Sequence, residues 1–400
     1  MAIQNKPLTG KNILIAPLNW GLGHATRCVP LVEALQTAGY NVLLASDGSA
    51  GRFLQQAFPD LVYHELPSYR IRYPFKHIVW NILYGFPAML KAIILEHRAT
   101  QKIVATHQID ALISDNRYGI FYGRSHLFSK KTSQKQPVSF FMGHQFVLKL
   151  NPKTDELTIT EYLVSWVQQQ FLSRFFQKIL VPDAADNHEN LSGILAHHAV
   201  FTPKNKDTIY IGVQSRLRRS FEPLPQTASQ VKISDTANKR VLILLSGVEP
   251  KRTDLEVAIL KQLHAFAAYE TILVQGVFGN TPTEKKINAD FTIHSFCGNA
   301  DELAQKIAWA GIVICRSGYS TLMDLAVFND KKVILIPTVG QTEQLYLANR
   351  LARQQKAVVA QEASLNLAEA LVKAQEIDVF SCGNTKFGIE NLLAALRAIE

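Results

Sequence analysis

Short apolar runs alternate with stretches of helical periodicity along most of the chain. The runs predict buried strands, and apolar residues that recur every three or four positions predict amphipathic helices. Helices are expected at 27–38 and 86–105. Strands are expected in two series: 12–17, 41–45, 111–114 and 138–142, and then 241–245, 271–275, 291–294, 312–315 and 333–337. Strands that alternate with helices build parallel sheets.

A polar stretch separates the two series. Residues 223–239 are rich in Ser, Thr, Gln and Pro, and the alternation restarts after them. The length of 400 residues also exceeds what one hydrophobic core usually supports. We therefore expect an α/β protein with two Rossmann-like, doubly wound domains and an interdomain cleft.

The composition, 47% hydrophobic and 19% charged, is that of a globular protein. We expect no membrane span and no signal peptide, because the long apolar runs that define them are absent. The cysteines are scattered, with neither a metal-ligand spacing nor a disulfide framework, which favours a reducing cytoplasm. They are Cys28, Cys297, Cys315 and Cys382.

The charge is unevenly distributed. Residues 70–135 hold 11 Lys and Arg against 3 Asp and Glu, a net charge of +8. This bias favours an anionic partner (a membrane surface, a nucleic acid or a phosphorylated acceptor), although a merely solvated basic face is an equal alternative. Within it, 73–95 is rich in aromatic and aliphatic residues and has basic flanks, so residues 70–98 predict contact with anionic lipid headgroups. A core helix with solvated ends is the alternative.

A glycine-rich turn with a histidine and an arginine follows the first predicted strand: Gly21-Leu22-Gly23-His24-Ala25-Thr26-Arg27. Open α/β sheets bind ligands beyond the carboxyl ends of their strands. The glycines permit a sharp turn and a close ligand, and a histidine there is a candidate general base. Asp115 follows strand 111–114 and is expected either to orient His24 or to be the base itself. His144-Gln145 follows strand 138–142 and is expected to line the acceptor side, with a structural role as the alternative.

A phosphate-binding pattern follows strand 312–315. Arg316-Ser317-Gly318-Tyr319-Ser320-Thr321 opens a predicted helix that carries Asp324. Backbone N–H groups, hydroxyls and the helix dipole converge on an anion at such a terminus. Taken alone, Ser320 and Thr321 also fit the simpler interpretation of N-caps.

Three further polar loops in the second half support a binding site at strand ends. Hydrogen-bonding side chains in such loops suit a hydroxyl-rich ligand, and arginines suit phosphate oxygens. The loops are Thr338-Val339-Gly340-Gln341-Thr342-Glu343-Gln344, then Ser246-Gly247 with Arg252, and Gly212-Val213-Gln214-Ser215-Arg216. A nucleic-acid binder would not require these loops, and the interleaved basic and aromatic residues of a stacking platform are absent.

These motifs make the chain resemble the MurG-like glycosyltransferases, the family 28 branch of the GT-B superfamily. The resemblance is strongest over 296–349. It implies that Asp324 holds a ribose, that Phe296 packs on a uracil ring and that the Cys297 backbone reads the edge of that ring. It also implies that Glu343-Gln344 reads the sugar, with Gln344 as the better match, that Arg216 meets the diphosphate, and that His24 faces the acceptor. The Gly-His-x-x-Arg-Cys pattern also looks like a nucleotide-sugar hydrolase of pseudaminic acid biosynthesis.

The implied fold is GT-B. We expect an acceptor-binding domain at 1–213, a nucleotide-sugar-binding domain at 214–382, and a helix at 383–400 that packs back toward the first domain. The implied activity is inverting, metal-independent transfer of N-acetylglucosamine or another hexose from a UDP-sugar to a hydroxyl, on a lipid-linked or cell-envelope acceptor at the inner face of the membrane. The sequence leaves open a hydrolase or an epimerase that acts without an acceptor.

Overall fold

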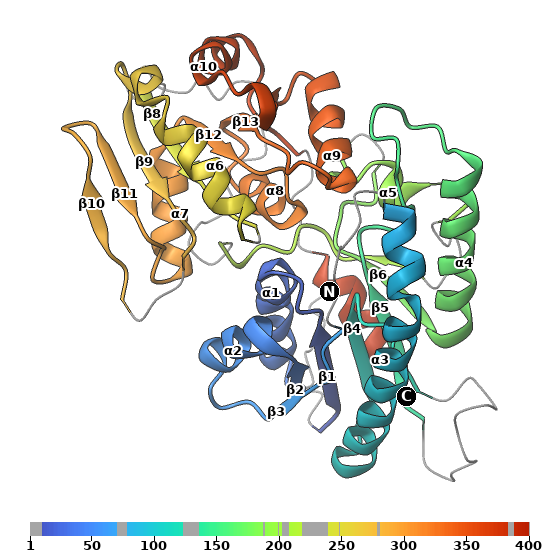
Figure 1. Ribbon diagram of the computed structural model, residues 1–400. Helices are drawn as coiled ribbons and strands as arrows, with labels where there is room; N and C mark the ends of the chain where they lie inside the picture. The colour runs from blue at the N-terminus through green and yellow to red at the C-terminus, as the bar shows by residue number, and fades with distance from the viewer. Residues whose placement is uncertain are drawn as a thin grey trace, which may run out of the picture.

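Each predicted strand series forms its own sheet in the computed structural model (Figure 1). The structure describes residues 10–69, 78–122, 136–186, 189–198, 200–201, 208–217, 239–247, 249–277, 281–382 and 388–399, without the side chains of 78–86. Most of the polar stretch at 223–239 therefore lies outside the described residues, as does the basic and aromatic start of the 70–98 segment.

The first sheet has the strand order β3-β2-β1-β4-β5-β6-β7, and all of its pairings are parallel. Its strands are β1 Asn12–Pro17, β2 Asn41–Ser46, β3 Tyr63–Glu65, β4 Ala111–Asp115, β5 Val138–Met142, β6 Lys178–Val181 and β7 Thr208–Tyr210. Its helices are α1 Gly23–Thr37, α2 Gly48–Ala57, α3 Ile78–His107, α4 Ile159–Phe175 and α5 Ile194–His197.

The second sheet has the order β10-β11-β9-β8-β12-β13-β14, parallel except where β10 pairs with β11. Its strands are β8 Arg240–Leu244, β9 Glu270–Val274, β10 Glu284–Lys286, β11 Phe291–His294, β12 Ile312–Cys315, β13 Lys332–Leu335 and β14 Val358–Val359. Its helical elements are α6 Lys251–Leu260, η3 Leu263–Phe266, α7 Ala300–Trp309, α8 Tyr319–Ala326, α9 Thr342–Arg353, η4 Glu362–Ser364 and α10 Leu367–Glu376. The predicted two-domain α/β architecture is confirmed.

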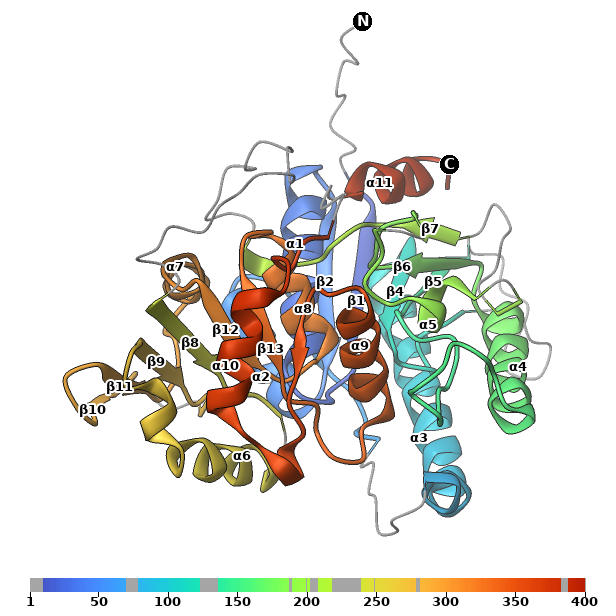
Figure 2. The same ribbon diagram turned by 90° about the horizontal axis from the view of Figure 1, so that it is seen from above.

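The last helix, α11 Ile389–Arg397, returns to the first domain (Figure 2). Its apolar face, with Leu392 and Leu396 fully buried, packs into the same core cluster as Ile15 of β1 and Leu31 of α1. Burial of such side chains is the main source of stability at this contact.

Two predicted helices begin earlier than expected. The helix expected at 27–38 begins at Gly23, so His24 and Arg27 lie in the first turns of α1. The helix expected at 86–105 begins at Ile78 and runs through Pro87. The unpredicted strands β3, β6, β7, β10 and β14 have only two to four residues each. Such runs are too short to show a hydrophobic period, and they form strands because they pair with neighbouring strands.

Candidate active site

His24, Arg27 and Asp115 meet at the carboxyl end of the first sheet. Residues three apart on a helix share one face, so α1 presents His24 and Arg27 together. Nδ1 of His24 lies 3.0 Å from Oδ1 of Asp115 at the end of β4. Nε of Arg27 donates to Oδ2 of Asp115 over 2.7 Å, and its NH2 group donates to Oδ1. The result is a buried carboxylate between a guanidinium and an imidazole.

Arg27 also reaches the next strand end. Its NH1 group lies 2.8 Å from Nδ1 of His144, which follows β5. Because arginine is always a donor, Nδ1 of His144 accepts this bond and the ring proton resides on Nε2. That Nε2 donates to Oε1 of Glu343 over 2.8 Å. Arg27 therefore fixes the tautomer of His144.

The charges of this cluster set the protonation of its members. Burial would raise the pKa of Asp115, but Arg27 and His24 hold it well below its usual range. Burial lowers the pKa of His24 and the charges of Arg27 and His144 add to this effect, against the opposing influence of Asp115. Near neutral pH, Asp115 is thus an anion and His24 a neutral imidazole.

His24 has one ring nitrogen inside the cluster and one outside it. Its Nδ1 lies 3.0 Å from Oδ1 of Asp115 and 3.0 Å from NH2 of Arg27. In the tautomer in which Nδ1–H donates to the ionised Asp115, the lone pair resides on Nε2, which has no hydrogen-bond partner among the described residues. The side chain of His24 is 11% exposed, whereas that of Asp115 is fully buried with both oxygens engaged. In that tautomer Asp115 is placed to orient the ring of His24.

The two domains touch at the first turns of α1 and α8. The Ser320 hydroxyl donates to the carbonyl of Gly23 over 3.1 Å. A Cβ on Gly23 would lie 2.7 Å from that hydroxyl oxygen, so only glycine permits this approach. Beside it, the ring of His144 stacks on that of Tyr319, with centroids 3.9 Å apart and planes 9° from parallel. The predicted acceptor and donor loops therefore face each other directly.

A second group lies on the donor side, around Asp324 on α8. The Ser215 hydroxyl donates to Oδ1 of Asp324 over 2.5 Å. Burial raises the pKa of Asp324 to about 6, although Arg216 and Ser215 oppose it. The charge of Arg216 also acts on Cys297, whose pKa burial raises to about 11. The residues predicted to bind the diphosphate, the ribose and the base are thus near one another.

Several other predicted residues are committed to internal contacts. Arg252 donates to Glu249, Glu256, Thr253 and the Gln275 carbonyl, so its guanidinium is already engaged by residues of α6 and of the segments beside it. The Gln344 amide is tied to Gln341 and to the N–H of Thr338, and the Ser317 hydroxyl donates to the Gln344 carbonyl. Within the pair at the start of α9, it is Glu343 that reaches the other domain.

The remaining predicted residues lie at the expected strand ends. Gly318 is the N-cap of α8, and Thr321 lies in the first turn of that helix. Phe296 is buried after β11. The carbonyl of Gln145 accepts from Gln168 of α4 over 3.3 Å. Three residues are placed in turns without a described side-chain contact to the cluster: Gly21, Ser246 and Gly247.

The sequence predicts no role for Arg27. It also does not reveal Tyr319 as the partner of His144 or Ser215 as the partner of Asp324. The spacing of His24 and Arg27 was the available signal, since positions three apart share a face once the turn is recognised as helical. The contacts of Tyr319 and Ser215 join segments more than a hundred residues apart, so no local pattern reveals them.

Two features are absent from the described residues. Among them, no group of three or more His, Cys, Asp or Glu side chains is arranged to hold a metal ion. None of the helices, over those same residues, is long and apolar enough to cross a membrane.

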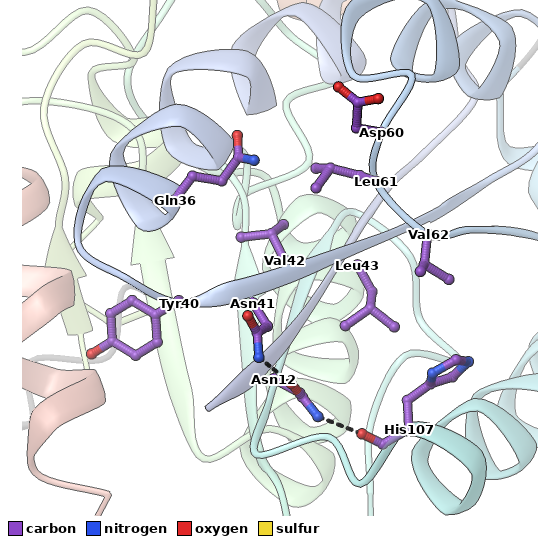
Figure 3. Close-up of a pocket in the computed structure, with 10 residues that line it drawn as sticks. All are labelled: Asn12, Gln36, Tyr40, Asn41, Val42, Leu43, Asp60, Leu61, Val62 and His107. Atoms are coloured by element: carbon purple, nitrogen blue, oxygen red, sulfur yellow. Dashed lines mark hydrogen bonds between the residues drawn. The ribbon is translucent and has the colours of Figure 1, made fainter. Parts of the chain in front are cut away.

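A pocket of about 380 Å³ lies elsewhere, lined by residues that include Asn12, Asn41 and His107 (Figure 3). It opens at the amino ends of β1 and β2, whereas His24 and Asp115 lie at the carboxyl ends, so it is separate from the candidate site.

The chain is similar to known glycosyltransferases in part of its sequence and in its fold. Residues 254–378 match the Glycosyltransferase family 28 C-terminal domain. Over 87 residues the chain is 40% identical to the UDP-N-acetylglucosamine--N-acetylmuramyl-(pentapeptide) pyrophosphoryl-undecaprenol N-acetylglucosamine transferase of Mannheimia succiniciproducens. That match spans 22% of this chain and 23% of the relative.

Solved structures resemble the chain over almost its whole length. MurG of Acinetobacter baumannii superposes with a TM-score of 0.52 at 14% identity, covering 98% of this chain and 99% of that one. The glycotransferase of kitacinnamycin gives 0.59 at 13% identity, covering 98% and 95%. Phytolacca americana UGT2, complexed with UDP-2fluoro-glucose and pterostilbene, gives 0.56 at 16% identity, covering 98% and 94%. The predicted GT-B fold is confirmed, and so is the resemblance to MurG-like glycosyltransferases of family 28, whose C-terminal domain residues 254–378 match.

Proposed function

We propose that this protein is an inverting, metal-independent glycosyltransferase that moves a sugar from a UDP-sugar to a hydroxyl acceptor. The main support for the proposal is the position of the His24–Asp115 pair. It lies in the first domain, at the turn of α1 whose Gly23 carbonyl accepts from Ser320 in the first turn of α8, and α8 belongs to the region that matches the family 28 domain. In the proposed step the acceptor oxygen attacks the anomeric carbon. Its proton goes to Nε2 of His24, and the bond to UDP breaks with its electron pair on the leaving diphosphate.

The donor side is proposed to stabilise that leaving charge. The N-terminus of α8 offers unpaired N–H groups and the positive end of its dipole, and Arg216 supplies a full charge nearby. Asp324 is proposed to accept from the ribose, a role in which the nucleotide replaces the Ser215 hydroxyl. The relative from Mannheimia succiniciproducens makes N-acetylglucosamine the first donor sugar to test, and other hexoses follow.

A panel of nucleotide sugars tests the donor proposal. A ligand that binds the folded state raises its melting temperature by mass action. We expect UDP and one UDP-sugar to raise it in the wild type and less in Arg216→Gln, while Arg252→Gln, whose guanidinium is engaged internally, responds like wild type. The stabilised donor is then turned over with and without hydroxyl acceptors. Release of free sugar or of an isomeric nucleotide sugar without any acceptor would establish the hydrolase or epimerase alternative instead.

We also propose that the acceptor is presented at an anionic membrane surface. Helices α3 and α4 lie side by side in both views (Figures 1 and 2). Together they expose apolar side chains, of which Ile159 is 89% exposed: Met89, Leu90, Leu95, Ile159, Tyr162, Leu163, Trp166 and Val167. The described charged residues exposed on these two helices are basic: Lys91, Arg98, Lys102 and Arg174. Apolar residues beside basic ones suit an anionic headgroup layer.

Flotation with vesicles that contain anionic lipid tests this surface. We expect wild type to float at physiological salt and the double variant Leu163→Ser, Trp166→Ser to remain in the soluble fraction. Val372→Ser is the matched control, since Val372 is equally exposed but lies on α10 of the other domain. Absence of wild-type binding, or equal binding by all three proteins, would refute a membrane-presented acceptor.

A further inference from the structure

Four side chains form one hydrogen-bonded row from the first domain to the second. Asp115 accepts from Arg27, Arg27 donates to His144, and His144 donates to Glu343. The first three side chains are almost completely buried, and that of Glu343 is 30% exposed. His24 joins the row at Asp115. The residue proposed to take the acceptor proton is therefore linked to the start of α9, where the sugar-reading pair is predicted.

Glu343 is the member of that pair with a free oxygen. Its Oε1 accepts from His144, while Oε2 makes no hydrogen bond to any residue that the structure describes. The amide of Gln344 is bound to Gln341 and Thr338. Burial alone would raise the pKa of Glu343, but His144, His24 and Arg27 lower it, so the carboxylate is ionised. An ionised oxygen accepts strong hydrogen bonds from sugar hydroxyls.

Helix α9 is docked on the first domain along its length, which holds Glu343 in place. The N–H of Ile194 donates to the Tyr346 hydroxyl over 3.1 Å, and Asn349 donates to the Pro152 carbonyl over 3.2 Å. Arg350 donates to Asn190 over 3.1 Å, and Arg353 pairs with Asp155. The His144–Glu343 bond is thus one of several contacts between α9 and the first domain, and it is the one located at the candidate active site.

We propose that Arg27 and His144 are positioning residues that couple the sugar-contacting carboxylate Glu343 to the base His24 across the cleft. This inference rests on the proposed function, since it assigns roles within that reaction. Arg27 holds Asp115 against His24 and fixes the tautomer of His144, so that His144 presents its proton to Glu343. Glu343 then binds the donor sugar only when the two domains are arranged so that His24 is also in position.

A double-mutant cycle on the donor kinetics tests the coupling. We expect His144→Ala and Glu343→Gln each to raise KM for the donor and lower kcat. Their combination is expected to be no worse than the poorer single variant, falling short of the product of the two effects by at least about fivefold. His144→Gln, which keeps an N–H donor for Glu343, is expected to recover part of the loss. Multiplicative effects of the two single changes would overturn the proposal.

Imidazole titration by NMR provides a readout that needs no catalysis. The groups that act on His24 are Asp115 from β4, Arg27 from α1, His144 after β5 and Glu343 from α9. Cys28 from α1 and Tyr319 from α8 lie near Arg27. We expect Arg27→Gln to raise the titration midpoint of His24, since a positive neighbour is lost, and Arg27→Lys to leave it near wild type while lowering kcat. An unchanged midpoint in folded Arg27→Gln would refute the role of Arg27, and if that variant does not fold, a wild-type kcat in Arg27→Lys would do so. A protein that shows these titrations but transfers no sugar would disprove the proposed function alone.

Discussion

Nδ1 of His24 and Oδ1 of Asp115 lie 3.0 Å apart although the two residues are 91 positions apart in the chain. If His24 is the base, His24→Gln lowers kcat by about 10²- to 10⁴-fold, which is the usual contribution of general base catalysis. Binding of UDP is expected to be unchanged, because the described hydrogen bonds of His24 lie within the first domain. Stopped assays of transfer, together with calorimetric titration of UDP, separate the two effects.

Asp115→Asn provides the companion measurement. The amide keeps the shape of the carboxylate but offers an N–H to Nδ1, so His24 is held in the wrong tautomer, and kcat is again expected to fall. This variant also leaves Arg27 with a buried charge that lacks its partner, which costs about 3–5 kcal/mol of stability. His24→Gln carries no such cost, so transfer near the wild-type rate in that variant would remove His24 as the base.

The fall of kcat/KM at low pH is expected to report the protonation of His24. Burial and the charges of Arg27 and His144 lower the pKa of His24 below its ordinary value near 6.5. The base therefore stays neutral to a lower pH than a free histidine, and kcat/KM is expected to fall only below pH 6.5. Asp115 opposes this lowering of the His24 pKa. In a variant without Asp115, the remaining activity is therefore expected to fall at a still lower pH. A limb in the wild type that lies above pH 6.5 would contradict the assignment.

Much of this architecture could be predicted from the sequence, because strand ends and helix starts are local features. Runs such as 12–17 and 312–315 gave the sheets, and the loops after them contain His24, Asp115, Gly318 and Asp324. Partners across the cleft were beyond prediction. Nothing near Arg252 in the chain distinguishes an arginine held by Glu249 and Glu256 from one that binds phosphate.

Asp324 gives a prediction in which stability depends on pH. Its pKa is raised to about 6 in the folded protein, chiefly by burial, against about 3.9 for an unfolded aspartate. The folded state therefore binds more protons than the unfolded state between these values, and this group lowers stability as the pH rises from about 4 to above 6. Asp324→Asn keeps an oxygen for the Ser215 hydroxyl and cannot ionise.

Melting temperatures at pH 5 and pH 7.5 measure this effect. The difference between Asp324→Asn and wild type should favour the variant more at pH 7.5 than at pH 5, while stabilisation of the variant by UDP is reduced. Ser215→Ala removes the hydroxyl that lowers the pKa of Asp324, so it is expected to strengthen the pH dependence of the wild type. A variant whose difference from wild type is the same at both pH values would show that Asp324 is ionised in the folded state as readily as in water.

A buried ion network fixes α3 beside the acceptor side of the site. Glu96 of α3 accepts from Nε of Arg117, from the Tyr69 hydroxyl over 2.6 Å and from the N–H of Gly119 over 2.7 Å, while NH1 of Arg117 donates to Asp47 over 2.7 Å. Glu96 and Arg117 are fully buried. Removing Glu96 leaves the N–H of Gly119 without its acceptor and leaves Arg117 with Asp47 as its remaining counter-charge, so Glu96→Ala is expected to lower the free energy of unfolding by about 3–5 kcal/mol.

Urea unfolding of Glu96→Ala against Lys102→Ala checks this prediction. Lys102 lies on the exposed face of the same helix, and its removal is expected to change stability by no more than about 0.5 kcal/mol. Glu96→Gln should fall between the two, because the amide oxygen still accepts from Gly119 but one of the two carboxylates that neutralise Arg117 is gone. If both alanine variants unfold at the same urea concentration, the network does not anchor α3. Other contacts would then have to hold α3 in its position beside α4.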